Sequence, residues 1–488
     1  MKKIIYGVLT IVFLFLLPAC EKFTDITPKG KNLLQNVSDL ESILNYNYTL
    51  NGSVQAGSAA GKTTAEDAFV FDDVNVLIDD IYPYVQNVTT VITAPTKTLN
   101  YAFLTSDETV DRKSLAATDI KYSKLYFIIN NVANAVIASA DNAAGDRSKA
   151  NQYKAEAYVL RAYFHYMLVN FYAKAYNPAT ASSDAGIPYI KEDNVISEPN
   201  VKSTVAEVYS NILADIDAAL QLNSLPKTNV NTMRAGLGFA YAVKAKVLLS
   251  MRRYEDALAA ANQSLEINNT IEDHRTYEPV GDVPFIKAAT AVGENLFYAS
   301  GAVSGPSYRA ISLEITKNYY EPGNIINKYI QPYYEDEGGT DLNGVAGAQV
   351  WYTFDYAVNS GGLSSIDCYL TKAECLARSG ATQNINGAMA IINSIRQKRN
   401  HPTGYTPLTA NTEQQAMAYL KKLSRIEFLY TYKNYVNIKR WNTEDAYKET
   451  ISRTINGVSY QLKPESSLWI FPFPQNATNY NPNLTQNY

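Results

Sequence analysis

Two segments of the chain repeat one helical pattern, and this repeat constrains the fold more than any other feature. Residues 241–248 and 369–376 share tyrosine, lysine, alanine and leucine at matching positions. Each is followed by a turn and a second helical pattern that opens on alanine, at Ala257 and Ala388. Small residues there let two helices joined by a short turn approach closely. The pattern is typical of irregular tetratricopeptide-like helix pairs, although chance similarity between amphipathic helices is the alternative.

Helical periodicity covers most of the chain outside two irregular regions. It predicts helices over 119–140, 150–175, 204–222, 233–250, 254–267, 366–378, 386–399 and 412–432. Thr204, with Glu207 three residues later, has the spacing of a capping box. Residues 51–115 and 268–362 lack this periodicity, and 295–300 and 348–356 are candidate short strands. We therefore expect a mainly α protein, one compact unit made of parts 37–267, 268–362 and 363–488.

The first residues have the features of a bacterial lipoprotein signal. Lys2 and Lys3 precede an uncharged stretch over 4–17, shorter than the roughly 20 residues that cross a bilayer. Leu17-Pro18-Ala19-Cys20 matches a lipobox, apart from the less usual proline. We expect residues 1–19 to be a signal peptide, Cys20 to carry diacylglycerol and palmitate, and 20–36 to be a lipidated tether. An ordinary signal peptide with a chance cysteine is the alternative.

Other chemistries find little support in the sequence. The three histidines, His165, His274 and His401, lack the paired spacing of a zinc site or a catalytic triad. Cys368 and Cys375 lie about 10 Å apart along a helix, beyond disulfide reach, and are expected to be buried. A net charge of −4 gives no sign of nucleic-acid binding. We expect no cofactor beyond the lipid at Cys20.

Seven further motifs, in order along the chain, resemble the SusD/RagB family of outer-membrane lipoproteins. They comprise Leu125-Tyr126 with Ala133-Asn134, the stretch 155–164, Gly186-Ile187-Pro188, the stretches 373–380 and 392–399, the elements from Arg425 to Trp441, and the ending 471–487. The chain departs from the family at Thr431-Tyr432, where Glu-Gly is usual. This departure leaves the type of ligand open.

The resemblance implies both a fold and a role. The fold would be mainly α and SusD-like, with about four irregular tetratricopeptide-like helix pairs plus a loop-rich ligand-binding region with a few short strands. The protein would face outwards from the cell outer membrane, bind glycan and deliver it to a SusC-like TonB-dependent transporter, without being an enzyme. A peptide-binding RagB-like lid is the alternative. A glycan-degrading enzyme is a further one, because 47 acidic residues could supply a pair of catalytic carboxylates.

Aromatic residues in the two irregular regions are the candidate ligand contacts, by analogy with the family's site. Their flat faces can stack on sugar rings, and packing inside the protein is the alternative for each. They are Tyr82, Tyr84, Tyr308, Tyr319, Tyr320, Trp351 and Tyr352, with Tyr333 and Tyr334 in the same stretch.

An acidic loop and four residues near the C-terminus are the remaining distinctive features of the sequence. An acidic, glycine-rich loop with Asp336, Asp341 and Asn343 is compatible with either a calcium ion or a solvated turn, and it lacks the spacing of an EF-hand. We expect Arg425, Glu427, Arg440 and Trp441 to be structural. Arg425 and Glu427 should face different sides of their helix, because only residues three or four apart are neighbours.

Overall fold

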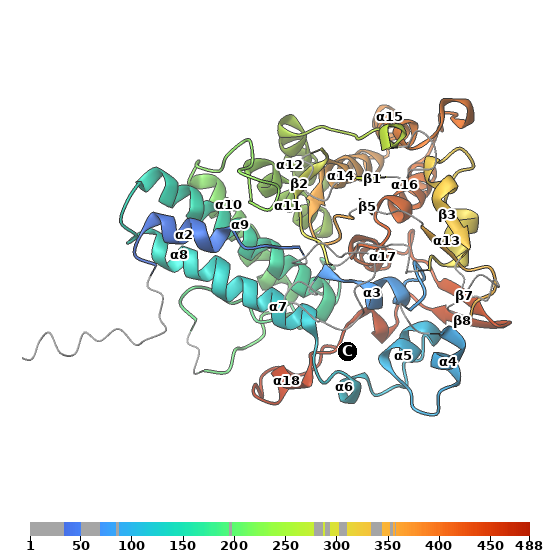
Figure 1. Ribbon diagram of the computed structural model, residues 1–488, viewed down its shortest axis with the longest axis horizontal. Coiled ribbons are helices and arrows are strands. Elements are labelled where there is room, and N and C mark those ends of the chain that lie inside the picture. The colour runs from blue at the N-terminus through green and yellow to red at the C-terminus, as the bar shows by residue number, and fades with distance from the viewer. Residues whose placement is uncertain are drawn as a thin grey trace, which may run out of the picture.

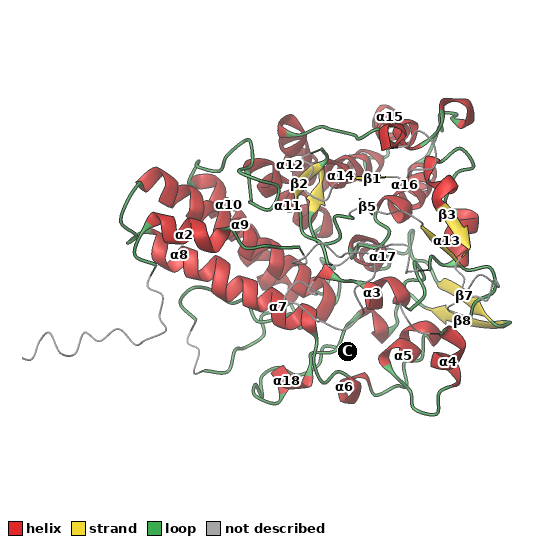
Figure 2. Cartoon of the chain, in the orientation of Figure 1, coloured by secondary structure: helices red, strands yellow, loops and turns green. Residues whose placement is uncertain are grey.

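Helices make up most of the structure, which is a computed structural model (Figures 1 and 2). It describes residues 34–49, 69–83, 87–194, 198–277, 286–287, 293–301, 310–332, 344–351, 355–356 and 358–488. The helices include α2 (Val37–Leu44), α7 (Ile120–Ile128), α8 (Ala135–Ala140), α9 (Arg147–Tyr172), α10 (Val205–Gln221), α11 (Leu237–Ser250), α12 (Tyr254–Ile267), α14 (Ser365–Ala377), α15 (Thr382–Arg399), α16 (Glu413–Glu427) and α17 (Lys433–Trp441). The prediction of a mainly α protein is confirmed.

Successive helices pack on one another as the repeat predicts. Helix α8 packs on α9, α9 on α10, α10 on α11, α11 on α12, α12 on α14, and α14 on α15 (Figure 1). Alanines at the crossings, such as Ala245, Ala257 and Ala373, are completely buried. The capping box of α10 is present: the Glu207 backbone N–H donates to Thr204 Oγ1 (3.2 Å), and the Thr204 N–H donates to Glu207 Oε2 (2.8 Å).

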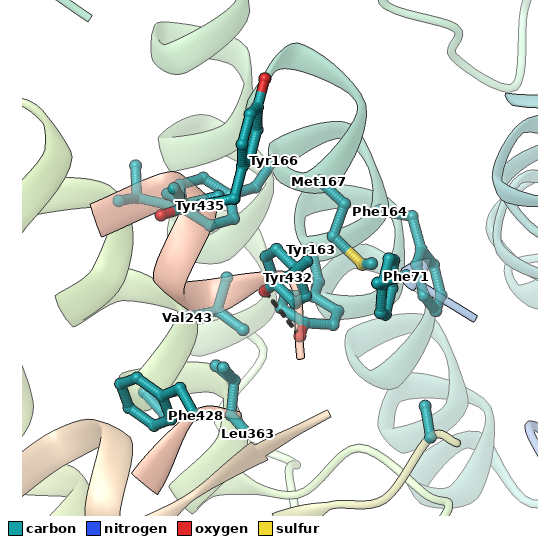
Figure 3. Packing of buried hydrophobic residues seen from close by; sticks show 14 of the residues in the cluster. Phe71, Tyr163, Phe164, Tyr166, Met167, Val243, Leu363, Phe428, Tyr432 and Tyr435 are labelled. Carbon is teal, nitrogen blue, oxygen red and sulfur yellow. Dashed lines mark hydrogen bonds between the residues drawn. The ribbon is translucent and has the colours of Figure 1, made fainter. Parts of the chain in front are cut away.

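Helix α9 runs through the centre of the core. Nearly all of its residues after Ala155 are buried, so it is surrounded by other helices. Figure 3 shows Tyr163, Phe164 and Met167 of α9 packed near Tyr432, which directly precedes α17. The Tyr163 and Tyr432 hydroxyls lie 3.0 Å apart. Many of the tyrosines thus fill helix interfaces, with their hydroxyls bonded inside the protein.

Short strands occur within and after the loop-rich part. They are β1 (Ile286–Lys287), β2 (Asn295–Phe297), β3 (Ile330–Pro332), β4 (Gln349–Trp351), β5 (Asp355–Tyr356), β6 (Leu363–Ser364), β7 (Ile451–Ile455) and β8 (Val458–Leu462). They form two-stranded pairs: β1 with β5 in parallel, and β2 with β6, β3 with β4 and β7 with β8 antiparallel. The strands expected near 295–300 and 348–356 are confirmed, whereas the β7–β8 hairpin is not foreseen by the periodicity.

Three stretches differ from the sequence-based expectation. Residues 72–83 and 87–115 are not irregular but contain α3 (Asp72–Leu77), α4 (Val88–Thr93), α5 (Leu99–Thr105) and α6 (Arg112–Leu115). The helix expected over 119–140 contains a π-helical segment, Ile129–Asn134. The helix expected to reach 432 ends at Glu427, because Tyr430 adopts a left-handed φ of 66° that separates α16 from α17.

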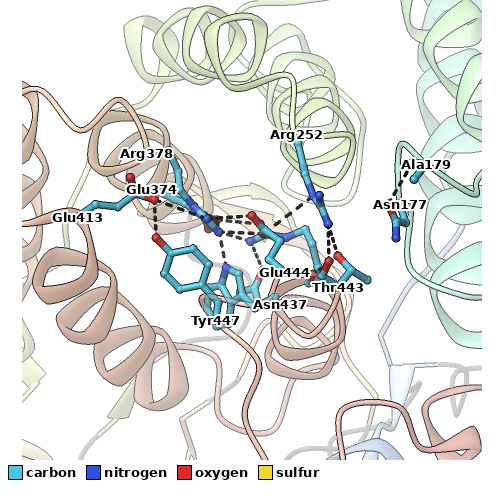
Figure 4. A network of polar contacts seen from close by, with 12 residues as sticks. Asn177, Ala179, Arg252, Glu374, Arg378, Glu413, Asn437, Thr443, Glu444 and Tyr447 are labelled. Atoms are coloured by element: carbon cyan, nitrogen blue, oxygen red, sulfur yellow. Dashed lines mark hydrogen bonds and ion pairs between the residues drawn. The ribbon is translucent and has the colours of Figure 1, made fainter.

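Glu374 of α14 is the centre of a buried ion network (Figure 4). It accepts hydrogen bonds from both terminal nitrogens of Arg440 (2.8 and 2.7 Å) and from Trp441 Nε1 (3.1 Å). Arg378, the residue directly after α14, pairs with it at 3.0 Å. Burial alone would raise the pKa of Glu374, but the two guanidinium groups and the Trp441 bond lower it to about 2. Arg440 and Trp441 are therefore structural, as predicted.

His165 is held neutral inside α9. Its Nδ1 lies 2.9 Å from the carbonyl oxygen of Arg161, so Nδ1 carries the proton, while Nε2 accepts from the Ile190 N–H at 3.0 Å. Its ring stacks on Tyr189 with 3.8 Å between the ring centroids. Burial lowers the pKa of His165 to about 3, against an ordinary value of 6.5.

Because the folded pKa of His165 lies below the unfolded one, its contribution to stability is complete above pH 6.5 and is lost as the pH falls towards 3. A proton that binds only in the unfolded state lowers the free energy of unfolding by about 2 kcal/mol between pH 8 and pH 5. We predict that the free energy of unfolding, measured with urea, decreases over this pH range by about 2 kcal/mol less in His165→Gln than in the wild type. Parallel pH profiles for the two proteins would show that His165 is not the group concerned.

Within the described part of the chain, no helix is both long enough and apolar enough to cross a membrane.

Candidate ligand-binding site

A polar hollow lies where the loop-rich part meets the C-terminal helices. Its lining includes Glu294 just before β2, Tyr320 after α13 (Leu313–Asn318), Arg399 at the end of α15, Glu427 at the end of α16, and Lys433 at the start of α17. It encloses about 90 Å³. The hollow is therefore small, and it can receive the polar edge of a ligand.

Arg399 forms the most extensively bonded group in this hollow. Its Nε and Nη2 donate to the two carboxylate oxygens of Glu427 at 3.0 Å, and Nη2 also lies 3.0 Å from Glu294 Oε1. Its Nη1 donates to the backbone carbonyl of Glu272. The Arg399 side chain is 2% exposed, so these bonds replace its hydration. Both carboxylates are thus tied to one guanidinium group.

A second buried cluster lies at the start of α17. The Lys433 ammonium donates to Asp367 Oδ2 at 2.8 Å, and Lys246 lies 3.7 Å from Asp367 Oδ1. Burial lowers the pKa of Lys246, partly offset by the Asp367 carboxylate. Taken together, the Arg399 and Lys433 clusters contain three cations and three carboxylates. Among the described residues, the charges of these two clusters therefore balance one another.

Asn359 fixes the backbone on the strand side of the hollow. Its Oδ1 accepts from the N–H groups of Ala299 (3.1 Å) and Gly362 (2.9 Å), and its Nδ2 donates to the Phe297 carbonyl (2.8 Å). The chain passes so close at Gly362 that a Cβ there would lie 2.0 Å from the Phe297 oxygen. Only glycine fits at that position.

The adjacent tyrosines Tyr319 and Tyr320 reach different cavities. Tyr320 lines the polar hollow. Tyr319 lines a separate cavity of about 390 Å³ against α16, where the Arg425 guanidinium lies 5.3 Å from its ring centroid. Both side chains are half-buried. Two neighbouring candidate residues can therefore be tested against each other.

The other candidate ligand contacts predicted from the sequence do not line the polar hollow or lie outside the described residues. Tyr82 is 2% exposed and its hydroxyl accepts from the Leu313 N–H at 3.3 Å, so its ring belongs to the core. Trp351 is the last residue of β4, and only its backbone is described. Outside the described residues lie Cys20, Tyr84, Tyr308, Tyr333, Tyr334, Tyr352, Asp336, Asp341 and Asn343. The roles expected for these residues remain predictions.

Sequence reasoning did not identify Arg399, Glu294 or Lys433. Their partners lie 28 to 105 residues away, and no local pattern reports such distant pairs. The prediction that Arg425 and Glu427 face different sides is confirmed, since Arg425 pairs with Asp80 and Glu427 with Arg399. Among the described residues, no group of three or more histidines, cysteines or acids is arranged to hold a metal ion.

Two family models match the chain. The model described as "Starch-binding associating with outer membrane" matches residues 39–249, and the SusD family model matches residues 366–488. No curated protein sequence matches at a significant level.

Solved structures match over almost the whole length. A putative sugar binding protein from Bacteroides vulgatus is 18% identical with a TM-score of 0.66, covering 94% of this chain and 99% of that one. A SusD superfamily protein from Bacteroides thetaiotaomicron is 17% identical (TM-score 0.68; 93% and 100% covered). Surface glycan-binding protein A from Bacteroides uniformis is 14% identical (TM-score 0.64; 92% and 99% covered). The helix order, the seven motifs and the two matching models together show that this chain belongs to the SusD/RagB family.

Proposed function

We propose that this protein binds carbohydrate at the outer membrane and does not cleave it. Two of the structures that share its fold are named as sugar- or glycan-binding proteins, and one matching family model is described as starch-binding and associated with the outer membrane. The observation that carries the proposal is the polar hollow on this fold. It is lined by a tyrosine, asparagine side chains and a threonine, and the charged groups described there are paired with one another.

The chemistry of the hollow favours a neutral, hydroxylated ligand. Tyr320 supplies an aromatic face, and Asn324 and Thr431 lie on the same lining. Glu294 and Glu427 both accept hydrogen bonds from the Arg399 guanidinium, so each carboxylate is already bonded inside the protein. This arrangement supports binding without turnover at the hollow.

We further propose that a lipid on Cys20 anchors the chain, and that bound glycan passes to a SusC-like transporter. The proposal rests on the lipobox and on the family description that mentions the outer membrane. A diacylated, palmitoylated cysteine supplies enough buried methylene groups for stable anchoring.

The lipid anchor predicts a simple fractionation result. Wild-type protein should label with radioactive palmitate and sediment with outer membranes, whereas Cys20→Ala should do neither. As a control, Cys375→Ala should label like the wild type, because Cys375 is a buried thiol within α14. Equal labelling of wild type and Cys20→Ala would contradict the anchor.

The adjacent tyrosines give a sharp test of the site. After a glycan array identifies a ligand, we predict that Tyr320→Ala weakens its binding about tenfold by calorimetry, because a stacking face is lost. Tyr319→Ala is the matched control. It removes the same side chain one residue away, from the cavity against α16, and should change the affinity less than twofold.

Two results would contradict the proposed binding of glycan at Tyr320. Loss of binding in Tyr319→Ala alone would move the ligand to the cavity against α16. Saturable binding of peptides with no glycan bound would replace carbohydrate by peptide as the ligand.

A further inference from the structure

One aromatic side chain stands open to solvent, just after the short helix α18 (Gln475–Thr478). This helix lies beside α6 at the lower edge of Figure 1. Tyr480 is 86% exposed, more than any other large apolar side chain that the structure describes. The one other exposed tyrosine among the described residues, Tyr488, is 41% exposed, and its ring lies 3.9 Å from the Arg112 guanidinium. Tyr480 therefore differs from the tyrosines that fill helix interfaces.

Side-chain amides hold the backbone on both sides of Tyr480. Gln475 Nε2 donates to two backbone carbonyl oxygens of α6, both at 3.1 Å. Asn481 Nδ2 donates to the carbonyl oxygen of Asn200 at 2.9 Å, and its Oδ1 accepts from the Asn483 N–H at 3.0 Å, as in an Asx turn. The ring is thus presented from a fixed backbone, so little backbone entropy would be lost when a ligand binds.

The surface around the ring is polar but uncharged. Residues 475–485 include no acidic or basic residue. Asn476 and Asn479 are exposed, and their side-chain amides form no hydrogen bond within the described part of the chain. Each amide offers both donors and an acceptor. An open aromatic face with free amides nearby suits a sugar, which has an apolar ring face and hydroxyl groups at its edge.

Tyr480, Asn476 and Asn479 together form what we call the Tyr480 surface. None of the three lines the polar hollow or the cavity against α16. An open surface contacts only one face of a sugar unit, so a single unit would bind weakly. A polysaccharide repeats the same unit many times along one chain, which raises the local concentration of units at such a contact. The surface therefore favours a polymer over a free sugar.

We propose that the Tyr480 surface is a second contact for a neutral polysaccharide, with the Tyr480 ring stacked on a sugar face and the amides of Asn476 and Asn479 bonded to hydroxyl groups. This inference rests on the proposed carbohydrate binding. It adds that the bound glycan is a polymer, and that the protein contacts it at a place separate from the hollow.

The test measures binding of the full chain, in detergent, to immobilised soluble starch, galactomannan and dextran, with polygalacturonate as the anionic comparison. We expect saturable binding of at least one neutral polymer and weaker binding of polygalacturonate. Tyr480→Ala should weaken the binding of the neutral polymer about fivefold, because the stacking face is lost. Its melting temperature should equal that of the wild type, because the side chain is exposed.

Two control variants isolate the effect of the ring. Tyr480→Phe keeps the aromatic face and should bind within twofold of the wild type. Phe127→Ala removes another exposed aromatic ring, 43% exposed on α7, and should also bind within twofold. A trisaccharide cut from the bound polymer gives a further comparison. Its binding should be weakened by Tyr320→Ala and left unchanged by Tyr480→Ala, because only the polymer gains from the second contact.

The results against this inference differ from those against the proposed function. If no polysaccharide binds to the wild type, carbohydrate binding fails and this inference fails with it. If a neutral polymer binds and Tyr480→Ala retains full affinity, only the second contact is overturned. Tyr480-dependent binding of polygalacturonate alone would overturn the neutral ligand. Loss of a co-purifying membrane protein in Tyr480→Ala, with polymer binding unchanged, would assign the surface to a protein partner instead.

Discussion

The arrangement of the C-terminal helices depends on one buried carboxylate, Glu374. It is 2% exposed, and the guanidinium groups of Arg440 and Arg378 both bond to it. Removing one partner from such a buried pair typically costs about 3–5 kcal/mol, because a charge is left without compensation. The pair therefore fixes the position of α17 against α14. Once α17 is fixed, its first residue Lys433 lies at the polar hollow.

Similar buried pairs join the rest of the chain. Arg161 of α9 pairs with Asp215 of α10, and Arg425 of α16 pairs with Asp80. Arg453 of β7 pairs with Asp79, so one short segment after α3 holds both the C-terminal hairpin and α16. Each pair links residues that are far apart in the sequence. Together they connect the tetratricopeptide-like helices to the strands and short helices around the polar hollow.

The sequence predicts local structure well and distant pairing poorly. The alanine-rich crossings and the Thr204–Glu207 capping box are local patterns, and they predicted the helix pairs correctly. The short helices over 72–115 were missed because they are too short to show periodicity, and the break at Tyr430 depends on a backbone angle. Tyr320 could be predicted as a site residue because it is aromatic and lies in an irregular region. Arg399 and Glu294 could not be predicted, since only the fold brings them together.

The central claim is that this chain captures carbohydrate without cleaving it. The most direct measurement incubates the purified protein with a panel of polysaccharides, and follows both retention of the polymer and the number of reducing ends over time. Our account predicts saturable retention of at least one polysaccharide with an unchanged number of reducing ends. Release of new reducing ends that scales with protein concentration would contradict it.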